Sequence, residues 1–129
     1  METRILGTTE ADIRLAAEMI QKGGLVAFPT ETVYGLGADA LNAEAVGKVY
    51  AAKGRPSDNP MIVHIAQKSD MNKLTDGITP EVKRLMEAFW PGPLTMVVPA
   101  KDVIPKVTTG GLATVGVRMP EDTIARALI

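Results

Sequence analysis

The sequence has 129 residues, 46% of them hydrophobic, a length that fits one globular domain with a core of its own. It lacks cysteine, which excludes disulfide bonds, thiolate metal sites and a cysteine nucleophile. The formal net charge of −1 argues against a generally basic nucleic-acid-binding protein, but residues 1–50 hold four Lys and Arg against seven Asp and Glu, whereas residues 51–118 hold nine against six. Anions are expected to bind in the second stretch.

Acidic residues interrupt the apolar positions at the N-terminus. Glu2, Glu10, Asp12 and Glu18 leave neither an apolar signal core nor a span of about 20 apolar residues. We therefore expect a cytoplasmic protein with no membrane partner.

The N-terminal half is predicted to form two helices and one strand. Apolar residues recur at helical spacing between Thr9 and Lys22, whereas residues 25–28 are all apolar and end at a proline, as expected of a strand buried on both faces. Thr and Asn are favourable N-caps, and paired glycines end helices. The predicted elements are a helix capped by Thr9 and ended by Gly23-Gly24, a strand at residues 25–28, a loop from Pro29 to Leu41, and a helix from Asn42 to Ala52.

Helices and strands continue to alternate in the second half. Pro at the first helical position is favourable, and Trp90-Pro91-Gly92-Pro93 predicts a stiff turn. The predicted elements are a strand at residues 61–65, a short helix capped by Ser69, a helix capped by Thr79 that runs from Pro80 to Phe89, strands at residues 94–98 and 113–117, and a helix that begins at Pro120. This alternation predicts an α/β fold built as one domain over residues 1–129.

The last predicted helix has no stop signal. It has Glu121 and Asp122 in its first turn, and the sequence ends on Leu128 and Ile129 without a C-cap. We therefore expect a domain that is truncated at its C-terminal end, with apolar surface around Leu128 and Ile129.

The loop after the first strand is the best candidate for a site. Residues 29–37 bring two threonine hydroxyls, a carboxylate and a phenol to the end of a strand, where α/β sheets form their ligand crevices. The alternative is a turn whose threonines bond the local backbone and whose glycines allow unusual dihedral angles. Residues 35–40 match a loose dinucleotide pattern, G-x-G-x-x-A, which we reject because six residues separate it from the strand and Asn42 starts the helix.

Two cations follow the second predicted helix. Lys53 and Arg55 are held by Gly54 and Pro56 just before a strand, a geometry suited to fixing phosphate charge. The alternative is a pair of surface cations that favour the negative end of the helix dipole, an effect of roughly 0.3–1 kcal/mol. The sequence has no G-x-x-x-x-G-K-[ST] motif, so nothing supports a P-loop enzyme.

His64 is the only histidine and lies in an apolar strand, so it cannot belong to a multi-histidine metal cluster, and no metal site is expected. The alternative to a residue that faces a pocket is a hydrogen-bonded core histidine. Arg118 follows the strand at residues 113–117, where its guanidinium can reach a carboxylate in the same crevice. Its alternative is an ordinary cation at a strand end.

Four motifs in order, FPTETVYGLGADA, KGRPSDNPMIVHI, FWPGPLT and TVGVRMP, closely resemble those of the YrdC-like L-threonylcarbamoyladenylate synthases. The match covers nearly all of the chain beyond the first helix. The resemblance implies an open, twisted, mixed α/β sheet with flanking helices and a large, positively lined cavity. It also implies an S-x-N motif and further ATP contacts downstream of the position of Ile129.

The resemblance implies synthesis of threonylcarbamoyl-adenylate and pyrophosphate from L-threonine, bicarbonate and ATP, with Mg²⁺ accompanying ATP. Other tRNA-modifying proteins then pass the threonylcarbamoyl group to tRNA. No protein nucleophile is needed, so positioning and charge stabilisation carry the catalysis. By motif position, the implied catalytic residues are Lys53 and Arg55, the threonine-binding residues are Thr32, His64 and Arg118, and the ATP-binding residues are Arg55, Asn59 and Thr114. We therefore expect His64 to face the cavity, within reach of Thr32 and Arg118.

Two rival functions remain open at this point. A concave basic surface suits double-stranded RNA or tRNA without catalysis, although the sequence offers only two Tyr, two Phe and one Trp for base stacking. The carbamoyl-transferring domain of hydrogenase maturation proteins is also related, but the zinc-finger and acylphosphatase-like regions that accompany it have no counterpart in these residues.

Overall fold

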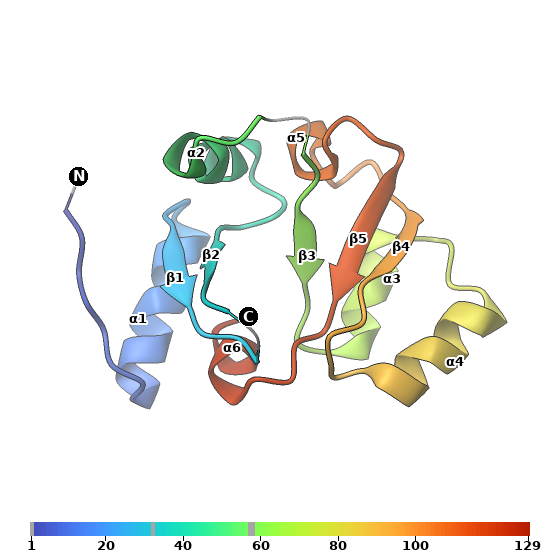
Figure 1. The fold of residues 1–129 in the computed structure, drawn as a ribbon, viewed down its shortest axis with the longest axis horizontal. Helices are drawn as coiled ribbons and strands as arrows, with labels where there is room; N and C mark the ends of the chain where they lie inside the picture. Colours follow the sequence, from blue (N-terminus) through green and yellow to red (C-terminus); the bar gives the residue numbers. More distant parts are fainter. Residues whose placement is uncertain (1, 32, 57–58) are drawn as a thin grey trace.

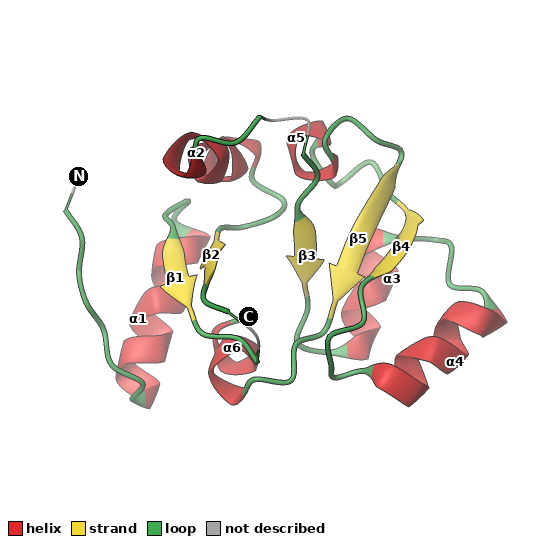
Figure 2. Cartoon of the chain, viewed as in Figure 1, coloured by secondary structure: helices red, strands yellow, loops and turns green. Residues whose placement is uncertain are grey.

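The computed structural model describes residues 2–31, 33–56 and 59–129. Short helices and strands alternate along the chain (Figures 1 and 2). The elements are α1 (Glu10–Gln21), β1 (Val26–Phe28), β2 (Gly35–Gly37), α2 (Ala43–Lys53), β3 (Ile62–His64), the 3-10 helix η1 (Lys68–Asp70), α3 (Met71–Leu74), α4 (Pro80–Phe89), β4 (Met96–Pro99), α5 (Lys106–Thr109), β5 (Thr114–Arg118) and α6 (Thr123–Leu128).

The described strands form two sheets. β1 and β2 make an antiparallel pair, and a second sheet has the order β3-β5-β4, with β3 parallel and β4 antiparallel to β5. Helices flank both sheets, since α1 contacts β1 and α6, while α2 contacts α5, which in turn contacts β5 (Figure 1). The predicted α/β class with a mixed sheet and flanking helices is confirmed, although the described strands are divided between two sheets instead of joined in one.

Three predicted N-caps are confirmed. The side-chain oxygens of Thr9, Asn42 and Thr79 each accept a hydrogen bond from the backbone N–H three residues later, at 3.2, 3.1 and 3.2 Å. These bonds satisfy N–H groups that have no partner within the first helical turn. The starts of α1, α2 and α4 are therefore fixed by local chemistry.

Two predicted helix starts are wrong. Ser69 lies inside η1, because the backbone N–H of Gln67 is bonded to the carboxylate three residues later at 3.3 Å and the turn begins there. The last helix begins three residues after Pro120. Asp122 sets this later start, since its carboxylate accepts hydrogen bonds from two backbone N–H groups of the first turn, at 2.9 and 3.0 Å.

The predicted loop from Pro29 to Leu41 contains the strand β2. Phe28 pairs with Gly35 in the register, and its ring covers both glycines of β2: a Cβ added at Gly37 would lie 2.6 Å from Cε1 of Phe28. The glycines therefore make room for an aromatic ring instead of forming a turn. The prediction that the first strand is buried on both faces is also wrong, because Ala27 is exposed.

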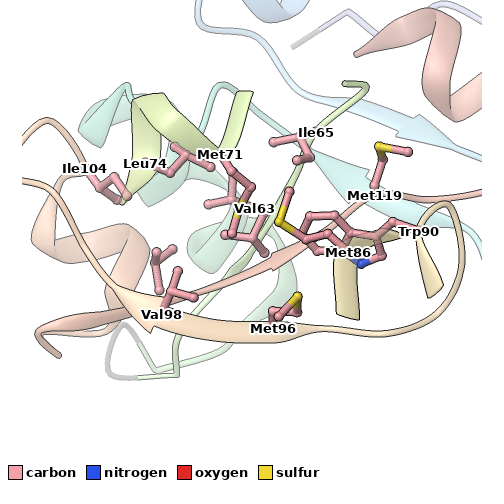
Figure 3. Close-up of a cluster of buried hydrophobic side chains, with 12 residues drawn as sticks. Val63, Ile65, Met71, Leu74, Met86, Trp90, Met96, Val98, Ile104 and Met119 are labelled. Carbon is pink, nitrogen blue, oxygen red and sulfur yellow. The ribbon is translucent and has the colours of Figure 1, made fainter. Parts of the chain in front are cut away.

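One face of the three-stranded sheet is covered by apolar side chains. Val63, Val115 and Val117 lie on this buried face, and the side chains of α3 and α4 pack over it (Figure 3). Trp90 joins this core while its indole Nε1 donates a hydrogen bond to the backbone oxygen of Leu94 at 2.8 Å. The strands predicted at residues 61–65, 94–98 and 113–117 are confirmed with shifted bounds. The members of the core are Val63, Ile65, Met71, Leu74, Met86, Trp90, Met96, Val98, Ile104, Val115, Val117 and Met119.

The C-terminal helix α6 packs against α1. Leu128 is only 6% exposed, whereas Ile129 is 45% exposed, so the apolar surface expected around both residues is limited to Ile129. Among the described residues, no helix is both long and apolar enough to cross a membrane.

Candidate functional site

The open face of β3 and β5 carries three of the predicted site residues. Alternate residues of a strand point to opposite faces, so His64 lies on the same face as Ile62. On β5, Arg118, Gly116 and Thr114 share that face, opposite the buried valines. The register pairs His64 with Arg118 and Ile62 with Gly116. His64 and Arg118 therefore lie at the carboxyl edge of the parallel strands, where α/β sheets usually bind ligands, and Thr114 lies at the amino edge.

A cavity of about 530 Å³ adjoins β3. It is lined by residues of α1, β1, β2, the segment before α2, α2, β3, η1, α3, α5 and the end of α6. Its charged and titratable described lining residues are Asp39, Asp70, Lys73 and His64. The resemblance implied a positively lined cavity, but the lining of this cavity is not positive. It contains two carboxylates, one lysine and one histidine.

His64 lines this cavity, as predicted. Its Nδ1 lies 3.2 Å from the backbone oxygen of Ile62, and a carbonyl only accepts, so Nδ1 carries the proton and Nε2 is left as an acceptor. Burial lowers the pKa of His64 below its ordinary value of 6.5, and the hydrogen bond with Ile62 opposes this shift. The imidazole also meets the ring of Phe28 edge to face, with centroids 6.3 Å apart at 82°. His64 is therefore an oriented, neutral acceptor.

Arg118 forms an ion pair with Glu31. Its Nη2 contacts Oε1 of Glu31, and the two side chains are 13% and 20% exposed respectively. The other carboxylate oxygen of Glu31 accepts a hydrogen bond from the backbone N–H of Glu121 at 3.3 Å. Nε and Nη2 of Arg118 are buried, and neither has a hydrogen-bond acceptor among the described residues. The guanidinium is thus paired with Glu31 by charge while two of its buried nitrogens make no hydrogen bond.

The cations predicted to hold phosphate follow α2. Lys53 is the last residue of this helix, and Gly54 takes the left-handed conformation with φ of 63°, which ends the helix. The backbone N–H of Arg55 then bonds the backbone oxygen of Tyr50 at 3.1 Å. Both cationic side chains are exposed, and neither has an ion-pair partner among the described residues.

Tyr50 connects this loop to α5. The tyrosine is only 4% exposed, and its hydroxyl contacts the backbone oxygens of Asn59 and Val107, the latter at 3.0 Å. Since a hydroxyl has one proton, it can donate a hydrogen bond to only one of these two carbonyls at a time. Asn59 also donates its backbone N–H to Pro56 at 3.2 Å. The polypeptide that carries Lys53 and Asn59 is therefore anchored at both of its ends.

The predicted residues fall into two groups on the structure. His64 and Arg118 are register partners, whereas Thr114 lies four residues before Arg118 on the same face, about 13 Å away at the usual strand rise. Lys53, Arg55 and Asn59 precede β3, so they approach the amino edge that carries Thr114. Thr32 lies outside the described residues.

Three residues of this region were not assigned from the sequence. Phe28 and Glu31 belong to the FPTET segment, and their signal was the loop cluster itself, although the partners they contact lie far away in the sequence. Tyr50 lies in the helix predicted from Asn42 to Ala52, and a polar tip on an aromatic ring among apolar neighbours was the available signal.

A buried arginine and an oriented histidine at the carboxyl edge of parallel strands lie where α/β folds commonly bind small molecules. Residues 18–129 match the family model Sua5_yciO_yrdC, described as telomere recombination. The chain therefore belongs to the Sua5/YciO/YrdC family.

The relatives are threonylcarbamoyl-AMP synthases. The one from Pyrococcus abyssi (strain GE5 / Orsay) is 56% identical over 120 residues, which are 93% of this chain and 35% of that relative. The one from Bacillus subtilis (strain 168) is 52% identical over 125 residues, which are 96% of this chain and 36% of that relative. The solved structure of P. abyssi Sua5 complexed with L-threonine matches with a TM-score of 0.92 at 54% identity, over 98% of this chain and 36% of that one. This chain thus spans about a third of the length of these relatives.

Proposed function

We propose that this chain carries the threonine and ATP subsites of a threonylcarbamoyl-AMP synthase, which converts L-threonine, bicarbonate and ATP into threonylcarbamoyl-adenylate and pyrophosphate. The observation that carries the proposal is the match to the threonine-complexed P. abyssi Sua5 at a TM-score of 0.92 and 54% identity. The curated names of the relatives from P. abyssi and B. subtilis support the same activity.

The carboxyl edge of β3 and β5 has groups suited to an amino acid with a hydroxyl. Arg118 supplies a guanidinium for the threonine carboxylate, and its buried Nε is an available donor. His64 supplies Nε2 as an acceptor for the threonine hydroxyl, because Nδ1 is used by Ile62. Thr32 completes this subsite by motif position.

The amino edge has groups suited to a nucleotide triphosphate. Lys53 and Arg55 are exposed cations on an anchored loop, and they neutralise charge that develops on the phosphates as pyrophosphate leaves. Asn59 and Thr114 add polar contacts to ATP. Mg²⁺ accompanies ATP as part of the substrate in this proposal.

The reaction needs only that these two groups of residues hold their ligands in line. The threonine ammonium gives up a proton, and bicarbonate takes up a proton and releases water as CO₂ forms. The free amine then attacks the carbon of CO₂ and loses a second proton, which gives a carbamate. A carbamate oxygen then attacks the α-phosphorus of ATP, and the bond to pyrophosphate breaks. Gly116 lies between Thr114 and Arg118 on this face, and a Cβ added there would meet Cγ2 of Thr95 at 3.3 Å, so the glycine lets this neighbouring side chain pack closely.

The product is a mixed anhydride, so a later protein must pass its threonylcarbamoyl group to tRNA. Because the proposed product is passed on to tRNA, we place this chain in the cytoplasm. The alternative of a noncatalytic module for double-stranded RNA has no specific observation in its favour, because the described cavity lining has more carboxylates than cationic side chains.

The test is pyrophosphate release that depends on threonine and bicarbonate, measured in a polypeptide that continues through the expected S-x-N motif. Arg55→Ala should lower the rate by about 100-fold or more, because a lost charge contact to the transition state costs several kcal/mol. The control is Arg14→Ala, which removes an exposed arginine paired with Glu10 at 3.3 Å. An unchanged rate for Arg55→Ala with a normal melting curve would contradict the ATP assignment.

A further inference from the structure

Glu31 is an exposed residue with a partly covered carboxylate that the proposed reaction does not use. Its side chain is 20% exposed, Oε1 contacts Nη2 of Arg118, and Oε2 accepts from the backbone N–H of Glu121 at 3.3 Å. Two contacts therefore fix the carboxylate on both of its oxygens. A charged group held in this way beside the threonine subsite faces whatever binds to Arg118.

The ion pair with Glu31 leaves hydrogen-bond donors of the Arg118 guanidinium without acceptors. Nε and Nη2 donate in parallel from one edge of the planar group, and a carboxylate often takes both at once. Here Glu31 contacts Nη2 only as an ion pair, and Nε and Nη2 are both buried without a hydrogen-bond acceptor among the described residues. A buried donor without a partner costs free energy, so this edge favours a ligand oxygen that bonds Nε.

We infer that Glu31 and Arg118 together form a receptor for the zwitterion of an α-amino acid, with Glu31 as the residue that pairs with the ligand ammonium. The inference rests on the proposed function and deepens its threonine subsite. An α-amino acid carries its ammonium and carboxylate on the same carbon, so a ligand carboxylate on Nε of Arg118 brings the ammonium next to the neighbouring carboxylate of Glu31. The ion pair between Glu31 and Arg118 is then replaced by two ion pairs, one between the ligand carboxylate and Arg118 and one between the ligand ammonium and Glu31.

The charge balance explains why a zwitterion is favoured. Glu31 and Arg118 are neutral as a pair, and a zwitterion keeps the bound site neutral. A ligand with only a carboxylate places two anions around Arg118, and a ligand with only an ammonium takes Glu31 and leaves Arg118 uncompensated. Both arrangements are costly in a site with side chains that are 13% and 20% exposed.

The substitution Glu31→Gln isolates this charge. Glutamine has the same shape, and its amide oxygen can still accept from the N–H of Glu121, but it cannot neutralise an ammonium. The matched control is Glu10→Gln, which removes the same charge from an exposed pair with Arg14, where the side chains are 90% and 71% exposed. Melting curves of both variants verify that they fold.

The experiment is a titration of this chain followed by NMR at the backbone amide of Glu121, with L-threonine, 3-hydroxybutyrate and threoninol as ligands. The wild type and Glu10→Gln should bind threonine about tenfold or more tightly than either singly charged analogue. In Glu31→Gln, threonine affinity should fall about tenfold or more, and 3-hydroxybutyrate affinity should rise.

The outcomes separate this inference from the proposed function. If threonine binds the wild type but loses no affinity in Glu31→Gln, Glu31 is not the ammonium partner and the inference alone is overturned. Tighter threonine binding in Glu31→Gln overturns it too, because Glu31 would then compete with the substrate carboxylate. If Glu31→Gln fails to fold, the wild type alone provides the test. Equal affinity of the wild type for threonine and 3-hydroxybutyrate would overturn the inference. A wild type that does not bind threonine overturns the threonine subsite itself.

Discussion

His64 shows how single contacts prepare a side chain for a role. The bond from Nδ1 to the Ile62 carbonyl selects one tautomer, and the edge of Phe28 restrains the ring. Phe28 reaches His64 because two glycines of β2 leave space beneath its ring. The bond to Ile62 is local, whereas the contact between Phe28 and His64 joins segments far apart in the sequence and could not be predicted from it.

The stability of the fold should depend on the protonation of His64. Burial lowers the pKa of His64 in the folded state below 6.5, so the unfolded state takes up a proton first as the pH falls. Stability is therefore retained above about pH 6.5 and lost as the pH falls towards the folded-state pKa, with a slope of at most about 1.4 kcal/mol per pH unit. Urea unfolding between about pH 7.5 and 5.5 measures this loss, and His64→Gln should make the profile flatter. A profile as steep in His64→Gln as in the wild type would assign the loss to other groups.

At the scale of elements, the starts of α1, α2 and α4 were predictable, whereas two other helix starts and the strand pairing were not. The caps at Thr9, Asn42 and Thr79 depend on one side chain and one N–H three residues away, so the sequence contains the whole interaction. β2 depends on Phe28 covering glycines across a hairpin, which looks like a turn in one dimension. The ion pair of Glu31 with Arg118 joins the segment after β1 to the end of β5, and only the assembled fold brings these two segments together.

Tyr50 should stabilise the cation loop as well as the fold. Its hydroxyl contacts buried backbone oxygens of the loop and of α5, so Tyr50→Phe leaves a carbonyl without its donor and should lower the free energy of unfolding by about 1–3 kcal/mol. ATP affinity should fall with it, whereas threonine affinity should not. Urea unfolding and ligand titration measure the two effects. The control is Tyr34→Phe, which changes a tyrosine that is 77% exposed. Equal stability of the two variants would show that the Tyr50 hydroxyl is dispensable.

At the scale of the whole molecule, this chain spans about a third of its curated relatives, and its sheet pairs His64 with Arg118 at the carboxyl edge of two parallel strands. The cavity beside β3 is lined in part by the end of α6, where Ile129 is 45% exposed. Ligands gain affinity when most of their surface is enclosed. The fold class was predictable because four motifs resemble those of one family. The neutral to acidic charge of the cavity lining was not predictable, since it depends on which side chains point into the cavity.

Continuation of the chain should therefore strengthen binding. We predict that a polypeptide extended through the expected S-x-N motif binds ATP and threonine more tightly than residues 1–129 do, and releases pyrophosphate faster. Calorimetric titration of both polypeptides provides the comparison. Equal affinities and equal rates would mean that residues 1–129 already contain the complete site.

The central claim is that threonine and ATP bind at opposite edges of the same sheet face. The most direct measurement is an NMR titration of backbone amides in residues 1–129, first with L-threonine and then with MgATP, at concentrations high enough to detect weak binding. We predict that threonine shifts the amides around His64, Arg118 and Glu121, and that MgATP shifts those around Arg55, Asn59 and Thr114. Threonine shifts confined to the Lys53–Asn59 loop, or identical shifts from both ligands, would contradict the claim.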